Sequence, residues 1–158
     1  MPERSEDPCL PQAARLAGAR KKKRKENNRE MDYLEEPEKI YDLKKRTKRF
    51  ALDCIKMSES LPPTYFGNHV RGQLLRSSTS VASNYRAAKH AQSIQAFISK
   101  ISIVIEESDE SEFWLEIILE NNMIENDNEA KRLRNEAHEL TSIFVKTRIT
   151  AQKNLIKN

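Results

Sequence analysis

The sequence is poor in glycine, cysteine and aromatic residues: its 158 residues include three glycines and two cysteines, and only 6% are aromatic. It contains no run of about 20 apolar residues, which a membrane-spanning helix needs, and no apolar N-terminal segment that would direct export. Cys9 and Cys54 stand apart, without the Cys-x-x-Cys or Cys/His spacing of redox and zinc sites. These absences argue against a disulfide-rich secreted domain and favour a reduced, cytoplasmic protein.

Charged residues are abundant, at 33% of the chain, and their signs are segregated along the sequence. Residues 1–30 hold nine Lys/Arg against five Asp/Glu, which accounts for the whole net charge of +4. From Lys39 to Lys100 there are twelve basic and three acidic residues, whereas from Ile101 to Glu139 there are three basic and twelve acidic residues. Two interpretations stay open: pairing between helices within the fold, or a basic surface for a polyanion or for an acidic face on another subunit.

Residues 1–30 are predicted to be a disordered basic tail, because they contain the run Arg20–Lys25 (RKKKRK) and lack apolar periodicity. The run fits a nucleic-acid-binding arm, a nuclear localisation signal, or translated sequence upstream of a true start at Met31. We favour an upstream extension or an inert tail over a functional arm. Residues 31–158 are expected to form the folded domain.

Helical periodicity with short interruptions predicts four amphipathic helices in this domain. The first covers about 37–60 and ends at Pro62-Pro63, and the second runs from about 64 to 91. Gly67 and Gly72 weaken its first turns, so a firm helix is expected only from about Gln73. The third helix starts near Ser93 as N-cap and ends at the turn Asn121-Asn122. The fourth follows Asn126, with Glu129 completing a capping box.

Each predicted helix carries an apolar or small-residue seam with alternating three- and four-residue steps, which is typical of coiled-coil-like packing. The fold class expected is therefore all-α, an antiparallel up-down four-helix bundle. The seam residues are Ile40, Leu43, Thr47, Phe50, Cys54, Met57 and Leu61 in the first helix, and Val70, Leu74, Ser77, Val81, Asn84 and Ala88 in the second. They are Ile94, Phe97, Ile98, Ile101, Val104, Ile105, Ser108, Leu115, Ile118 and Leu119 in the third, and Ala130, Leu133, Ala137, Leu140, Phe144, Thr147 and Ala151 in the fourth.

The centre of the second helix, Gln73–Ala88 (QLLRSSTSVASNYRAA), has five hydroxyl residues within seven positions. Helix propensity alone would not choose such a run, because Ser and Thr side chains compete for backbone hydrogen bonds. Small side chains on an inner helix face let a neighbouring helix approach closely. We therefore expect this stretch to lie at the closest helix–helix contact, with Arg76 and Arg86 flanking it.

No residue pattern indicates catalysis, a metal or a cofactor, and we expect the protein not to be an enzyme. Glu106 and Glu110 lie one turn apart, but a di-iron bundle needs Glu-x-x-His pairs, which the sequence lacks. An ion pair of either carboxylate with Arg76 or Arg86 is the preferred explanation.

Nucleic-acid binding is indicated by basic residues on the first two helices, although a solvated basic face explains them equally well. No aromatic residues are interleaved for stacking on bases. The predicted nucleic-acid-binding residues are Lys44, Lys45, Lys48, Arg49, Arg71, Arg76, Arg86 and Lys89.

QLLRSSTSVASNYRAA, followed by the EESDE of Glu106–Glu110 and the WLE of Trp114–Glu116, resembles the bacterial four-helix bundle proteins associated with intervening sequences of 23S ribosomal RNA genes. The resemblance covers roughly residues 40–144. Relatives include the accessory protein of diversity-generating retroelements and form ring-shaped homopentamers with basic surfaces, for which nucleic-acid or reverse-transcriptase binding is proposed. The family motif falls on Arg76, Ser80, Val81, Asn84, Tyr85, Arg86, Glu106, Glu107, Asp109, Glu110, Trp114 and Glu116. Ser78 and Ala82 replace glycines that are frequent in close relatives, so the resemblance implies a slightly wider helix contact here.

Together these features favour a non-enzymatic bundle that self-assembles, as a homopentamer if the resemblance holds, and binds RNA or DNA through a basic surface. The alternative is an adaptor that docks an acidic or nucleoprotein partner, such as a reverse transcriptase, through the same surface. An unrecognised enzyme is the third hypothesis. Neither the ligand nor the true start codon follows from the sequence.

Overall fold

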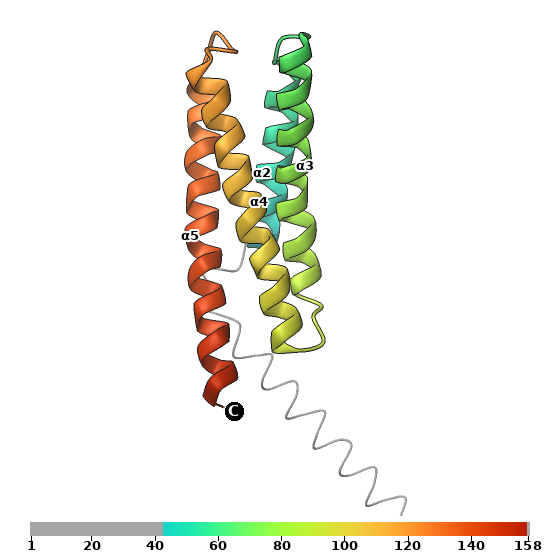
Figure 1. The fold of residues 1–158 in the computed structure, drawn as a ribbon, viewed down its shortest axis with the longest axis vertical. Coiled ribbons are helices and arrows are strands. Elements are labelled where there is room, and N and C mark those ends of the chain that lie inside the picture. Colours follow the sequence, from blue (N-terminus) through green and yellow to red (C-terminus); the bar gives the residue numbers. More distant parts are fainter. Residues whose placement is uncertain (1–42, 158) are drawn as a thin grey trace, which may run out of the picture. The chain divides into compact units, whose positions relative to one another are not determined.

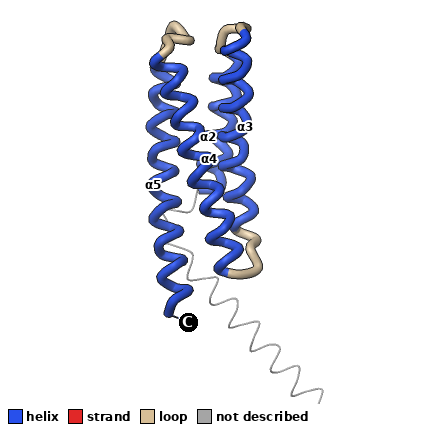
Figure 2. The backbone as a smooth tube through the Cα atoms, in the orientation of Figure 1, coloured by secondary structure: helices blue, strands red, loops and turns tan. Residues whose placement is uncertain are grey.

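The computed structural model describes residues 43–157, which form four α-helices and no strand (Figures 1 and 2). The helices are α2 (Leu43–Glu59), α3 (Tyr65–Ala88), α4 (Ile94–Glu120) and α5 (Asn128–Lys157). The predicted all-α, antiparallel up-down four-helix bundle is confirmed. The predicted tail at residues 1–30, the start of the first helix near residue 37 and its seam residue Ile40 lie outside the described residues.

Consecutive helices are neighbours, and α5 returns to pack against α2, so the bundle closes on itself. The connections are short, as expected for antiparallel neighbours. The α2–α3 and α4–α5 loops lie at one end of the bundle, and the α3–α4 loop lies at the other end with the end of α5 (Figure 1). No helix among residues 43–157 is long and apolar enough to cross a membrane.

The predicted seams form the core. In α2 and the following turn every described seam residue is buried, from Leu43 to Leu61. Most central seam residues of the other helices are buried as well, although Ile105 in α4 is only half-buried. One position in α3 was wrong: Asn84 is only half-buried, and the neighbouring Tyr85 occupies the core against Phe144, with ring centroids 5.0 Å apart. Seam residues near the helix ends, such as Ile94 and Thr147, are only partly covered.

The start of α3 is a regular helix, so the prediction of a firm helix only from Gln73 was wrong. Thr64 caps it, because its hydroxyl accepts a hydrogen bond from the Gly67 amide at 3.0 Å. Gly67 is needed for a close approach: a Cβ atom there would lie 2.0 Å from the carbonyl oxygen of Pro62. Gly72 has open space around it. The first glycine therefore allows the tight turn after α2.

The other helix ends follow the sequence closely. Ser93 caps α4 as predicted, with its hydroxyl accepting from the Ala96 amide at 3.1 Å. Asn122 has a positive φ of 49°, which Asn tolerates better than most residues, in the predicted turn after α4. The last helix begins at Asn128, slightly later than predicted. Asn126 accepts from the Asn128 amide at 3.1 Å, and the Glu129 carboxylate pairs with an arginine one turn later instead of completing a capping box.

The hydroxyl-rich stretch of α3 lies against α4, as the small side chains predict. Ser77, Ser78, Ser108 and Ser111 are buried, and the Ser111 hydroxyl donates to the Ser77 hydroxyl at 2.8 Å. The hydroxyls of Ser77 and Ser78 also donate to the carbonyl oxygen of Leu74 in their own helix. These bonds satisfy the hydroxyls of Ser77, Ser78 and Ser111 inside the helix pair, whereas the Ser108 hydroxyl has no partner among residues 43–157, so the serines act as small spacers.

Candidate nucleic-acid interface

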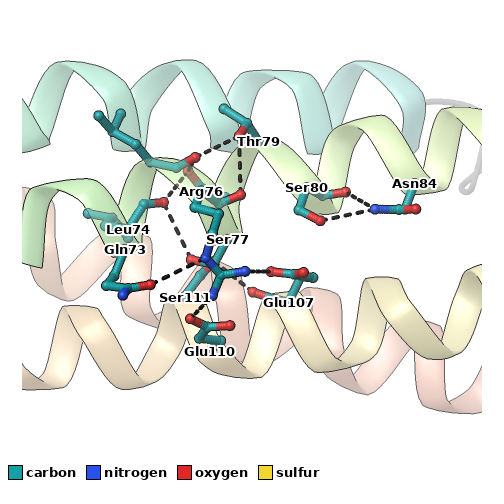
Figure 3. A network of polar contacts seen from close by, with 12 residues as sticks. Gln73, Leu74, Arg76, Ser77, Thr79, Ser80, Asn84, Glu107, Glu110 and Ser111 are labelled. Carbon is teal, nitrogen blue, oxygen red and sulfur yellow. Dashed lines mark hydrogen bonds and ion pairs between the residues drawn. The ribbon is translucent and has the colours of Figure 1, made fainter.

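Arg76 was predicted to bind nucleic acid, but its guanidinium crosses from α3 to α4 and pairs with acidic residues there (Figure 3). It hydrogen-bonds Glu110 at short range and lies 3.4 Å from a carboxylate oxygen of Glu107. Partial burial raises the pKa of Glu110, but hydrogen bonds from Arg76 and Trp114 outweigh this and hold the pKa below its ordinary value. The predicted pairing of Glu110 with Arg76 is therefore present, and this arginine is neutralised within the chain.

Arg71 was also predicted to bind nucleic acid, but its side chain binds the backbone at the end of α2. Its guanidinium donates to the carbonyl oxygens of Ser58 at 3.0 Å and Leu61 at 2.6 Å, and to the side chain of Asn68 at 2.7 Å. The two carbonyls belong to the end of α2 and the turn that follows, where the regular helical bonds end; the carbonyl of Ser58 also accepts from the Leu61 amide at 3.3 Å. Arg71 thus fastens the end of α2 to the first turns of α3.

Ion pairs also join α2 to α5. Arg46 binds both carboxylate oxygens of Glu136, at 2.6 and 2.9 Å. Asp53, whose side chain is only 9% exposed, accepts hydrogen bonds from Arg49 on α2 and Arg132 on α5. Burial raises the pKa of Asp53, but the two arginines outweigh this and leave the pKa below its ordinary value.

The other predicted basic residues, Lys44, Lys45, Lys48, Arg86 and Lys89, are exposed. They lie in the first turns of α2 and at the end of α3, which the antiparallel topology places at the same end of the bundle. The structure therefore brings together the N-terminal cations of α2 and the C-terminal cations of α3, and separates both from Arg71 and Arg76.

This end of the bundle, which we name the basic end, comprises residues 43–49, 81–105 and 140–156. It includes the N-terminal half of α4 and the C-terminal half of α5, because Lys100 donates to Asn84 at 3.3 Å and Arg148 donates to Ser102 at 3.5 Å. None of its residues is Asp or Glu. Its eleven basic residues are Lys44, Lys45, Arg46, Lys48, Arg49, Arg86, Lys89, Lys100, Lys146, Arg148 and Lys153.

The remainder, residues 50–80 and 106–139, is the acidic end. It carries six basic residues, Lys56, Arg71, Arg76, Lys131, Arg132 and Arg134. Its fourteen acidic residues are Asp53, Glu59, Glu106, Glu107, Asp109, Glu110, Glu112, Glu116, Glu120, Glu125, Asp127, Glu129, Glu136 and Glu139. The charges thus separate along the bundle axis, and not between one pair of helices and the other.

Sequence reasoning missed five cations of the basic end: Arg46, Lys100, Lys146, Arg148 and Lys153. The sequence does contain a signal for the last four of these cations: neither Ser60–Ile105 nor Leu140–Asn158 contains an acidic residue. Only the antiparallel order of the helices shows that half of each stretch reaches the same end.

The remaining residues of the predicted family motif have structural or surface positions. Asn84 donates to the backbone and hydroxyl oxygens of Ser80, at 3.1 and 3.0 Å (Figure 3). Its carbonyl oxygen faces Lys100, which links α3 to α4 at the basic end. Glu106 and Asp109 are exposed on α4, and Glu116 is half-buried.

Among residues 43–157 there is no group of three or more His, Cys, Asp or Glu side chains that could hold a metal ion. The only unpartnered buried side-chain polar atom in this part of the chain is the hydroxyl of Ser108. Cys54 lies in the core, where burial raises the pKa of its thiol to about 12 and disfavours the reactive thiolate. The arrangement is suited to binding charged partners through its surface.

Comparison with known proteins identifies a family and a similar solved structure. The sequence profile described as 23S rRNA-intervening sequence protein matches residues 39–146. A solved crystal structure from Bacteroides thetaiotaomicron, described as a protein of unknown function from the S23 ribosomal protein family, is similar with a TM-score of 0.60 and 28% sequence identity. The match covers 65% of this chain and 94% of that one. No curated protein matches.

Proposed function

Because the chain belongs to the 23S rRNA-intervening sequence protein family, we propose that it binds nucleic acid through the phosphate backbone at its basic end. The observation that carries this proposal is the convergence of eleven basic residues and no acidic residue from the described parts of all four helices. Arg46 and Arg49 pair with Glu136 and Asp53, so the proposal depends on the other nine. A polyanion that contacts this end releases condensed counterions, which is the main source of sequence-independent affinity for nucleic acids.

The positions of the aromatic residues support recognition of phosphates over recognition of bases. The exposed aromatic side chains in the described part of the chain, Tyr65, Phe66 and Phe113, all lie in the acidic end. At the basic end Tyr85 and Phe144 are buried in the core, and Phe97 is half-buried. Base stacking needs an accessible ring, so binding is expected to depend weakly on sequence and steeply on salt.

The test is a fluorescence-anisotropy titration of the protein with two labelled RNA hairpins of unrelated sequence and a DNA duplex, at several salt concentrations. Replacing Arg86 and Lys89 together by Gln removes two exposed cations of the basic end. This should lower the slope of log affinity against log salt by about 2. The matched control replaces Lys56 and Lys131, two exposed lysines of the acidic end, and should leave the slope unchanged.

Equal effects of the two double variants would refute the assignment to the basic end. If the protein binds none of the three probes even at low salt, the basic end serves another ligand. The alternative occupant is then an acidic or nucleoprotein partner, such as a reverse transcriptase, which would make the protein an adaptor.

Self-association is a second proposal, favoured by the separation of charge along the bundle. The basic end of one copy is complementary to the acidic end of another, and such a head-to-tail contact closes into a ring when the rotation allows it. Reversing the charge of Arg86 or of Glu125, an exposed carboxylate of the acidic end away from Trp114, should weaken assembly, and combining the two reversals should restore it. Sedimentation velocity would show this, and it would measure whether the oligomer is the pentamer that the family resemblance implies. That the protein is not an enzyme, and that it is cytoplasmic, stay predictions.

A further inference from the structure

The acidic end carries a small aromatic surface across α3 and α4, formed by His69, Phe113 and Trp114. The rings of His69 and Trp114 meet edge to face with centroids 5.5 Å apart, and those of Phe113 and Trp114 do so at 5.0 Å. Phe113 is 49% exposed and His69 is exposed, whereas Trp114 is half-buried. Phe66, one turn before His69, is 46% exposed.

Carboxylates surround this aromatic surface. On α4, Asp109 and Glu110 precede Phe113 by one turn and Glu116 follows it by one turn, so all three lie on the same side of the helix as Phe113. Glu110 is paired with an arginine of α3. Among residues 43–157, neither Asp109 nor Glu116 makes an ion pair, and the same is true of Glu106, one turn before Glu110.

This concentration of negative charge destabilises α4 in the isolated chain. After Lys100 α4 contains only acidic charges, with Glu106 and Glu110, Glu112 and Glu116, and Glu116 and Glu120 each four residues apart. Each such like-charge pair destabilises a helix by about 0.2–0.5 kcal/mol. The last turn of α4 contains no basic residue, although the helix dipole favours cations there. An external cation would relieve this repulsion.

We propose that the aromatic surface and its carboxylates bind an arginine- or lysine-rich segment of a partner polypeptide. A guanidinium can stack on the rings of Phe113 and Trp114 while it hydrogen-bonds Asp109 or Glu116, so one residue type satisfies both features. The protein would then hold a polyanion at its basic end and a basic polypeptide at its acidic end.

The size of the surface favours a short segment over a second folded copy of the chain. Each aromatic side chain can bury at most about 150–250 Å², and these rings are already partly covered. Three of them therefore offer a few hundred Å², against about 800 Å² per partner in a stable interface. Nucleic acid is disfavoured here because the unpaired carboxylates would repel its phosphates.

Trp114 is the only tryptophan of the chain, so its fluorescence reports on this surface directly. The full-length protein is titrated with a peptide of alternating Arg and Ala residues, and with a matched peptide in which Glu replaces Arg. The Arg peptide should change the Trp114 emission saturably and the Glu peptide should not. Phe113→Ala should weaken binding of the Arg peptide by about tenfold, and Asp109→Asn by about threefold at low salt. The control Leu52→Ala, which shortens an equally exposed side chain on α2, should not change the affinity.

Three results would overturn the proposal: no response to the Arg peptide, an equal response to both peptides, or equal weakening by Leu52→Ala. A change of sedimentation coefficient in Phe113→Ala would also overturn it, because the surface would then be covered by a second copy. The double replacement of Arg86 and Lys89 should leave binding of the Arg peptide intact. The proposal can therefore fail or succeed independently of nucleic-acid binding at the basic end.

Discussion

The same substitution at two glycines of α3 should have opposite effects on stability. In Gly67→Ala the new Cβ atom would lie 2.0 Å from the carbonyl oxygen of Pro62 and 3.1 Å from the Thr64 hydroxyl. Because the first of these atoms belongs to the backbone, the α2–α3 turn must move, and the Thr64 cap moves with it. In Gly72→Ala the new methyl group meets nothing within 4 Å.

The magnitudes follow from two opposing contributions. Overpacking costs about 1–3 kcal/mol, and a contact as short as that at Gly67 belongs in the upper part of this range. Replacing Gly by Ala within a helix raises the free energy of unfolding by up to about 1 kcal/mol. We therefore expect Gly67→Ala to lower the free energy of unfolding by about 1–2 kcal/mol, and Gly72→Ala to raise it by about 0.5–1 kcal/mol. Both variants restrict the unfolded chain equally, so their difference reports on the folded state alone.

The assay is thermal and urea unfolding followed by far-UV circular dichroism. In a domain of this size each kcal/mol shifts Tm by about 4 °C, so the two variants should differ by roughly 6–12 °C. Equal shifts of the same sign in both variants would refute the close approach of Gly67 to Pro62, and with it the reason for the regular start of α3.

Three further predictions concern single side chains. Arg71→Ala should lower the free energy of unfolding by about 1–2 kcal/mol in urea denaturation, because the Leu61 carbonyl loses its Arg71 donor and the Ser58 carbonyl keeps only the Leu61 amide. Arg71→Lys should restore less than half of this loss, since an ammonium cannot reach both carbonyls. Asp53 has a folded-state pKa below its ordinary value, so its contribution is complete above about pH 4 and is lost as the pH falls through the folded-state pKa. Asp53→Asn should therefore be about 1 kcal/mol less stable than the parent at pH 7, and this gap, measured by urea denaturation, should narrow steadily as the pH falls below about 4. In a Cys9→Ser background, Cys54 should resist thiol reagents at pH 8 and react at once in denaturant, because burial holds the pKa of its thiol near 12.

The architecture could be predicted from the sequence because each helix buries one stripe of residues at a fixed period. Leu74, Val104 and Leu140 are buried for this reason alone, and no knowledge of their partners was needed. The start of α3 could not be predicted in the same way. The role of Gly67 depends on a carbonyl of the preceding turn, and helix propensity, which counts glycine only as a cost, contains no such information.

The candidate site, too, could be predicted from the sequence only in part. The spacing of Arg71 and Arg76 placed them correctly on α3, but it could not show that carbonyls and carboxylates of neighbouring helices lie opposite them. Arg86 and Lys89 stay exposed, and among residues 43–157 no acidic residue lies in the basic end. Charge runs in the sequence suggested a basic pair of helices, whereas antiparallel packing sorts the charges by height along the axis. The sequence alone does not show which charges lie at the same end of the bundle. Lys146, near one end of the chain, belongs to the basic end only because α5 runs back toward it.

The basic end can be tested most directly by lysine footprinting of the unmodified protein. The protein is treated briefly with an acetylating reagent, with and without an RNA hairpin, and the modification of each lysine is measured by mass spectrometry. Bound RNA should protect Lys48, Lys89 and Lys146 at the basic end, and should leave Lys56 and Lys131 at the acidic end as reactive as before. Protection spread evenly over both ends, or confined to Lys56 and Lys131, would contradict the proposed interface.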